Sequence, residues 1–176
     1  MTPKATEPAA PLARAGMGRR LASFVYEGVL LFGVLMFAGL VYGVSTQQRH
    51  ALTGSAGLRV FLFFVLGAYF ILFWTRTGQT LAMQTWRVRL VTVNGGRVSL
   101  ARAAGRYLLA WMWFMPALLT LNYTGLKGGA PTFAALAAGV LGYAALAWLH
   151  PDRQYWHDAL CRTRLVNWQP SPRRKT

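Results

Sequence analysis

Residues 18–44 read GRRLASFVYEGVLLFGVLMFAGLVYGV, and this stretch decides the fold. Two arginines precede an apolar run from Leu21 to Val44 that contains a single acid, Glu27. At about 1.5 Å of rise per helical residue, the run is long enough to cross a hydrocarbon core of about 30 Å. It is too long for the apolar region of a secretory signal, and no small-residue cleavage site follows it. We therefore expect a first membrane-spanning helix over residues 21–44.

The composition also indicates a membrane protein. Of the 176 residues, 55% are hydrophobic, and 19 Lys and Arg face only four acids, which gives a net charge of +15. Such an excess of positive charge suits either nucleic acid or an anionic membrane surface. The charges lie between long apolar runs that a soluble nucleic-acid-binding domain would not contain. We therefore expect a bilayer with anionic lipids as the partner, and no nucleic acid.

Three further apolar stretches follow, at residues 58–75, 107–123 and 132–149. Together with the first they predict an all-α membrane fold, a bundle of four transmembrane helices within residues 18–167. Pro116 lies inside the third stretch and predicts a kink there, because proline removes one backbone hydrogen bond. The flanking segments 1–17 and 168–176 are poor in large apolar residues and predict disordered tails.

The distribution of basic residues gives an orientation for four spans. The N-terminal tail, the loop between the second and third spans, and the C-terminal tail carry sixteen of the 19 Lys and Arg. With four spans these segments lie on one side of the membrane, and the positive-inside rule places that side in the cytoplasm. With three spans the C-terminal tail would lie on the opposite side. The charges therefore favour four spans with both termini cytoplasmic.

The loop between the second and third spans contains a turn signal, Asn94-Gly95. Runs of β-favouring residues flank it at 86–93 and 97–100, and Asn-Gly between such runs is typical of a β-hairpin. We therefore expect a small cytoplasmic β-hairpin in this loop.

Small residues recur at helical spacing in two spans. Gly39 and Gly43 form a G-x-x-x-G pair in the first, and Ala134, Ala138 and Gly142 form one face of the last. Such faces let membrane helices approach closely. Glycine is also simply common in membrane helices, so for the first span both interpretations stay open.

Three charged residues are candidates for function. Glu27 lies inside the first span, where an ionised acid costs on the order of 3 kcal/mol at mid-membrane. Arg20 lies two helical turns earlier on the same face, and Asp158 in the C-terminal tail is level with the same membrane surface. Because a guanidinium can meet two carboxylates, we expect Arg20 to lie between the two acids. The cluster suits a proton or ion relay or a head-group site, or it pins the tail and loop to the bundle.

The sequence offers no catalytic constellation. The spans contain no nucleophile–base pair and no paired carboxylates, and the histidines lack partners at metal-ligand spacing. We therefore expect no catalytic residue, no metal site, no cofactor and no enzymatic activity.

Taken in order, these features resemble the RDD family of bacterial membrane proteins over about residues 16–167. The family is named for an arginine and two aspartates, which correspond here to Arg20, Glu27 and Asp158. Its Gly-x-Thr-x-Gly-Lys loop corresponds to residues 78–83, with Gly78 and Thr80 in the first two motif positions.

The chain departs from the family pattern at four positions. Glu27 replaces the first aspartate, Ala82 and Met83 replace the Gly and Lys of the loop, and Arg162 stands where the family has a glycine before Thr163. A task that needs that lysine or that glycine is not expected of this chain.

The resemblance implies a multi-pass protein of the bacterial inner membrane that serves as a transport or ion-exchange component for an unknown ligand. Four helices leave a narrow lumen, so transport implies a homo-oligomer. The alternative is a non-catalytic membrane protein that binds lipid or a membrane partner, which the basic loop and the lack of a polar path favour.

Overall fold

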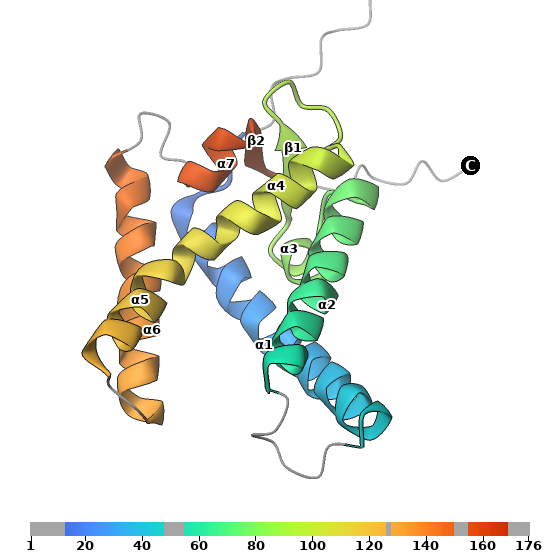
Figure 1. The fold of residues 1–176 in the computed structure, drawn as a ribbon. Coiled ribbons are helices and arrows are strands. Elements are labelled where there is room, and N and C mark those ends of the chain that lie inside the picture. The colour runs from blue at the N-terminus through green and yellow to red at the C-terminus, as the bar shows by residue number, and fades with distance from the viewer. Residues whose placement is uncertain (1–12, 48–54, 126–127, 150–154, 169–176) are drawn as a thin grey trace, which may run out of the picture.

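The computed structural model describes residues 13–47, 55–125, 128–149 and 155–168 (Figure 1). Its long helices are α1 (Met17–Ser45), α2 (Ser55–Arg76) and α6 (Gly129–Leu146). The shorter helices are α3 (Leu81–Thr85), α4 (Leu100–Ala110), α5 (Met115–Thr124) and α7 (Trp156–Leu160), with 3-10 turns η1 (Trp111–Trp113) and η2 (Ala147–Leu149). Two strands, β1 (Val88–Thr92) and β2 (Thr163–Asn167), form an antiparallel sheet.

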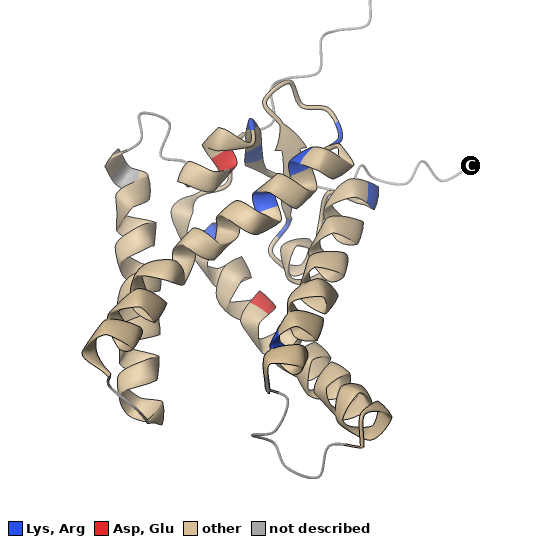
Figure 2. Cartoon of the chain, in the orientation of Figure 1, with Lys and Arg blue, Asp and Glu red and all other residues tan. Residues whose placement is uncertain are grey.

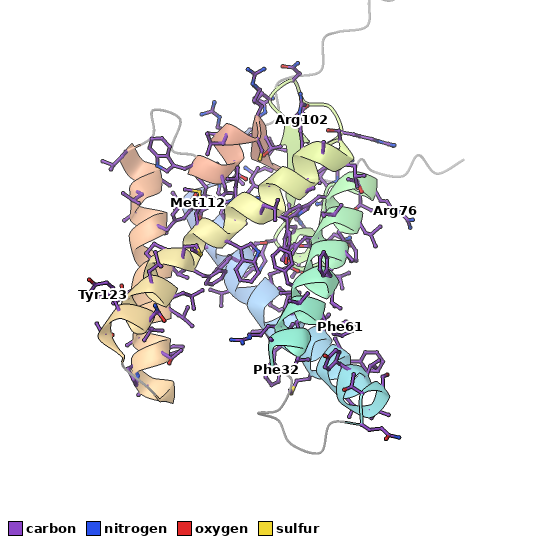
Figure 3. The ribbon with its side chains drawn as sticks, viewed as in Figure 1. Phe32, Phe61, Arg76, Arg102, Met112 and Tyr123 are labelled. Carbon is purple, nitrogen blue, oxygen red and sulfur yellow. The ribbon has the colours of Figure 1, made fainter. Side chains whose placement is uncertain are left out.

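The three long helices are apolar enough to cross a membrane. Their large side chains point outward: Phe32 and Phe37 on α1 are 66% and 69% exposed, and Phe133 on α6 is 75% exposed. Figure 3 shows Tyr123 likewise projecting away from the helices, whereas Arg76 and Arg102 lie toward the end of the molecule that carries the sheet. An apolar exterior is the reverse of a soluble protein and is what lipid-facing helices require.

The third predicted span is not one helix. Helix α4 ends at Ala110, η1 follows, and α5 starts at Met115 with Pro116 in its first turn. Proline is tolerated there because the N–H groups of a first helical turn have no partner within the helix. The ten residues of α5 reach about 15 Å, half of a hydrocarbon core. The described residues therefore contain three continuous candidate spans, and α4 runs obliquely into α5 (Figure 1).

The predicted hairpin is wrong in its second strand. The turn exists: Gly95 has a positive φ of 80° and its N–H donates to the Thr92 carbonyl oxygen at 2.8 Å. Strand β1, however, pairs with β2 from the C-terminal segment, with Leu90 opposite Leu165. Beyond the turn, Ser99 directly precedes the first residue of α4 instead of joining a strand. A local turn signal cannot reveal a partner some seventy residues away, because the pairing of strands depends on tertiary context.

The N-terminal tail becomes ordered earlier than predicted. The N–H of Ala15 donates to the Leu165 carbonyl oxygen at 3.0 Å, and the N–H of Asn167 donates to that of Ala13 at 2.8 Å. Residues 13–16 therefore cover the outer edge of β2, and the prediction of disorder fails for residues 13–17. The predicted tails at 1–12 and 169–176 lie outside the described residues.

The helices form two pairs. The end of the molecule that carries β1 and β2, called the sheet end below, joins the two pairs. Helix α1 packs on α2 and α5 packs on α6, while α4 contacts α2 and α7. The close approach of α5 and α6 occurs at Gly139, where an added Cβ would lie 3.1 Å from the Cβ of Ala117. Added at Gly39, Gly43 or Gly142, a Cβ would meet no atom within 4 Å. The predicted small-residue faces are thus not contacts within the described part of the chain.

Two buried clusters hold the sheet end together. One contains Trp74, Val88, Leu90 and Tyr107, and the other contains Trp113, Tyr143, Ala147 and Tyr155. The compact core thus lies at the sheet end, and the two helix pairs extend from it.

Candidate functional site

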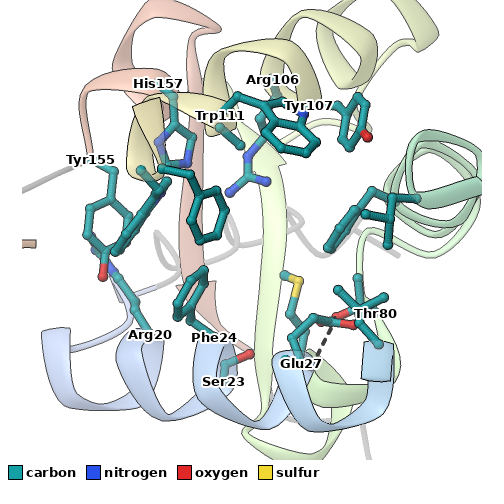
Figure 4. Close-up of a pocket in the computed structure, with 18 of the residues that line it drawn as sticks. Arg20, Ser23, Phe24, Glu27, Thr80, Arg106, Tyr107, Trp111, Tyr155 and His157 are labelled. Carbon is teal, nitrogen blue, oxygen red and sulfur yellow. Dashed lines mark hydrogen bonds between the residues drawn. The ribbon is translucent and has the colours of Figure 1, made fainter. Parts of the chain in front are cut away.

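A cavity of about 620 Å³ lies between the two helix pairs, below the sheet end. Most of its wall is apolar and comes from α1, α2, α4, η1, α5 and α6. Its charged and polar lining residues gather near the sheet end (Figure 4): Arg20, Ser23, Glu27, Thr80, Arg106 and His157. The cavity is therefore amphipathic, with one polar end and a long apolar wall.

Glu27 faces this cavity from α1 and is held by two hydroxyl groups. The Tyr69 hydroxyl on α2 donates to Oε1 at 2.6 Å, and the Thr80 hydroxyl donates to Oε2. Each carboxylate oxygen thus has a donor, which offsets the cost of burying the acid. These bonds tie α1 to α2 and to the loop before α3.

The loop that contains Gly78 and Thr80 positions one of those donors. Gly78 follows α2 with a φ of 73°, a conformation that favours glycine, and its carbonyl oxygen accepts from the Leu90 N–H at 2.8 Å. A Cβ at Gly78 would lie 2.9 Å from the Leu90 carbonyl oxygen. Thr80 is fully buried and also caps α3 by accepting from the Met83 N–H at 3.3 Å. The loop therefore serves the geometry around Glu27.

Ala82 and Met83, two of the positions at which the chain departs from the family pattern, follow the loop in α3 and are buried. Ala82 is fully buried in α3, and Met83 lines the cavity. At the position where the family pattern has a lysine, this chain places an uncharged thioether against the cavity.

Asp158 on α7 lies at the centre of a second buried cluster. Its Oδ1 is 2.8 Å from Nε of Arg106 on α4 and 3.3 Å from Nε2 of His157. The Arg106 guanidinium carbon stacks 4.2 Å from the centre of the Trp74 ring on α2. The His157 Nδ1 lies 3.1 Å from the Tyr143 hydroxyl on α6. This cluster connects α2, α4, α6 and α7.

The imidazole in that cluster is neutral at neutral pH. Burial lowers the pKa of His157 to about 4, because the loss of hydration outweighs the attraction of Asp158. Its contact with Asp158 is therefore not an ion pair, and Arg106 is the cation that balances this carboxylate.

Arg20 lies on the same cavity wall as Glu27, but the contacts described for the two acids come from other residues. Its guanidinium carbon is 5.9 Å from the centre of the Tyr155 ring, and the charge of Asp158 acts on it. The ion-pair partner of Asp158 is Arg106. That Arg20 lies between the two acids stays a prediction, while Arg106 and the two hydroxyl groups are further partners of these acids.

Sequence reasoning missed Tyr69, His157 and the role of Arg106 as the partner of Asp158. A hydroxyl in the middle of the second apolar stretch was the available signal for Tyr69, since a buried acid needs donors. Nothing local pairs Arg106 with Asp158, which lie 52 positions apart.

Grouped His, Cys, Asp and Glu side chains that could hold a metal ion do not occur among the described residues.

A family model described as the RDD family matches residues 14–162 of this chain. The matched range contains Arg20, Glu27, Gly78, Thr80 and Asp158. No curated protein and no solved structure matches the chain.

Proposed function

This chain belongs to the RDD family, and from that premise we propose that it is a non-catalytic protein of the bacterial inner membrane that binds a lipid-like ligand between its helix pairs. The observation that carries this proposal is the amphipathic cavity. At about 620 Å³ it falls within the range of about 300–1,000 Å³ of ligand sites. A molecule with an apolar chain and a small polar end matches its lining.

The position of the cavity supports a ligand drawn from the bilayer. Its apolar wall includes Leu31 and Leu35 of α1 and Leu118 of α5, which lie farther from the sheet end than Glu27 does. The hydrocarbon chain of a ligand that enters from the bilayer would exchange one apolar surrounding for another. The polar end of the ligand therefore decides its affinity.

The charges support an orientation with the sheet end in the cytoplasm. Figure 2 shows the arginines of the described segments gathered toward the end of the molecule that carries the sheet, and Arg59, close to the start of α2, is the exception. Basic side chains near an anionic leaflet each contribute about 1 kcal/mol to membrane attachment. We propose that anionic lipids surround this end and that both termini and the sheet face the cytoplasm.

A cavity-filling substitution tests lipid binding. Leu136→Trp on α6 places an indole in the cavity, whereas Leu141→Trp on the same helix adds it to a face that is 60% exposed. Native mass spectrometry in a mild detergent should find lipid retained by the wild type and by Leu141→Trp, and lost from Leu136→Trp. Equal retention by all three proteins would contradict the proposal.

Ion exchange is a second candidate, and the geometry at Glu27 favours it. A buried carboxylate between two hydroxyl groups can exchange a proton or accept a cation, and it faces the cavity. Because one copy offers a narrow polar path, this function implies a homo-oligomer.

Ion flux into proteoliposomes distinguishes this second candidate. Flux that the wild type supports and Glu27→Gln abolishes, with equal amounts of inserted protein, would support exchange. Equal flux through both would contradict a role for Glu27, and no flux above empty vesicles would leave lipid binding as the function.

A further inference from the structure

We propose that the polar end of the bound ligand is an oxyanion, a phosphate or carboxylate on an apolar chain, and that Arg106 binds it through its two terminal nitrogens. This inference deepens the proposed function and rests on it.

The side chain of Arg106 is fixed in an orientation that suits this task. Its Nε contacts Asp158 Oδ1 at 2.8 Å, and its plane stacks on Trp74, whose ring centre is 4.2 Å from the guanidinium carbon. With the side chain 9% exposed, both contacts lie in a protected interior. Figure 4 shows the terminal nitrogens directed into the cavity. Arginine held at Nε and by its face keeps its other two donor groups in a fixed fork.

Those terminal nitrogens have no acceptor within the described part of the chain. Among these residues, the hydrogen bond of Arg106 to Asp158 is made by Nε alone. Asp158 is not part of the cavity lining, and the lining acid, Glu27, already receives a hydroxyl group on each oxygen. Because these nitrogens face the cavity, an acceptor brought by a ligand can reach them and complete their hydrogen bonds.

The balance of charge around the cavity also favours a negative group. Arg20 lines the same cavity and adds a second positive charge near the sheet end. Met83 occupies the wall near Glu27 without a charge of its own. In a poorly solvated site, a charge-assisted bond to a guanidinium is roughly twice as strong as a neutral hydrogen bond. An oxyanion is therefore better matched than an alcohol or an ester.

The apolar wall then fixes how the ligand lies. Arg106 is on α4 near the sheet end, and Leu31, Leu35, Leu118 and Leu136 line the cavity away from it. The head group lies under α4, and the chain extends between the helix pairs toward the middle of the bilayer.

The test compares ligands that differ only in the head group. Hexadecyl phosphate, palmitate and hexadecanol are titrated against the full-length protein in one detergent, with inorganic phosphate as a competitor. We expect the two anions to bind about tenfold tighter than the alcohol, since only the anions offer the guanidinium a charged acceptor. Inorganic phosphate that displaces hexadecyl phosphate would identify free phosphate as a source of the group, whereas no displacement would identify the lipid.

The variant Arg106→Lys keeps the charge beside Asp158 and removes the fork. It should bring anion and alcohol affinities within about threefold of each other, while Arg102→Lys, on the exposed side of α4, should keep the wild-type preference. Equal binding of all three ligands by the wild type, or a full preference in folded Arg106→Lys, would overturn the inference. If Arg106→Lys does not fold, a structure of the wild type with hexadecyl phosphate decides by whether the phosphate contacts the Arg106 nitrogens.

The failure of this inference is distinguishable from that of the proposed function. If hexadecanol binds as tightly as the anions and Leu136→Trp prevents its binding, the inference of an oxyanion is wrong and the proposal of lipid binding stands. If no ligand with a hydrocarbon chain binds, both the oxyanion inference and the proposed function are wrong.

Discussion

At the scale of single residues, Arg162 shows how a departure from the family pattern affects the backbone. It stands at the glycine position of that pattern and has a φ of 51°, between α7 and β2. A non-glycine residue in the left-handed region costs about 1–2 kcal/mol. We expect Arg162→Gly to raise the free energy of unfolding by about 1 kcal/mol, because the relief of the left-handed backbone is only partly offset by the greater entropy of glycine in the unfolded chain. Thermal unfolding in detergent measures it, and a less stable Arg162→Gly would show that the arginine side chain stabilises the turn.

His157 gives a dependence of stability on pH. The folded protein keeps it neutral down to about pH 4, whereas the unfolded chain is protonated near its ordinary pKa of 6.5. The unfolded state therefore binds more protons between these values, and stability falls as the pH is lowered from about 6.5 to 4. We expect a loss of about 3 kcal/mol over that interval.

Unfolding measured from pH 7 to pH 4.5 tests this dependence, with His157→Gln as the control. Glutamine keeps hydrogen-bonding capacity without titrating, so the variant should be less stable at pH 7 and should lose less stability on acidification. Parallel curves for the two proteins would assign the pH dependence to other groups.

At the scale of elements, close packing depends on which glycine faces the neighbouring helix. On α6, a side chain at Gly139 meets Ala117 and the carbonyl oxygen of Trp113, while one at Gly142 meets open space. We expect Gly139→Val to destabilise the α5–α6 pair by about 1–3 kcal/mol, the usual cost of overpacking. Gly142→Val, three residues away, should change stability by less than about 0.5 kcal/mol. The two midpoints of thermal unfolding, measured side by side, check this, and equal effects would contradict the observed packing.

The short sheet connects segments that lie far apart in the sequence. Strand β1 uses one edge to pair with β2 and the other to bind the loop at Gly78, so it holds the C-terminal segment and the loop together. Helix α7 and Asp158 are thereby positioned beside α4. The buried ion pair with Arg106 depends on this arrangement, because neither helix alone brings the two groups together.

At the scale of the whole molecule, the orientation in the membrane can be tested directly. In a Cys161→Ser background, a cysteine at Ser45, at the end of α1, should react with an impermeant reagent added outside cells. A cysteine at Arg97, beside the sheet, should react only after permeabilisation. The reason is the positive-inside rule applied to the basic sheet end. Labelling of Arg97→Cys in intact cells would contradict the orientation.

The sequence by itself determined that the protein belongs in a membrane, the positions of three long helices, and the Asn94-Gly95 turn. Each depends on local properties, since apolar length and turn chemistry act within a few residues. It also singled out the charged residues Arg20, Glu27 and Asp158, and the resemblance to the family pointed to Gly78 and Thr80.

Tertiary structure alone decided the partners of those residues. The pairing of β1 with β2, the broken third helix, the hydroxyl groups on Glu27 and the Arg106–Asp158 contact join segments far apart in the chain. Such pairings are stabilised because distant segments bury apolar surface and pair polar groups together, and a local sequence pattern does not predict them. The cavity follows from the same cause, since it exists only where two helix pairs meet a common sheet end.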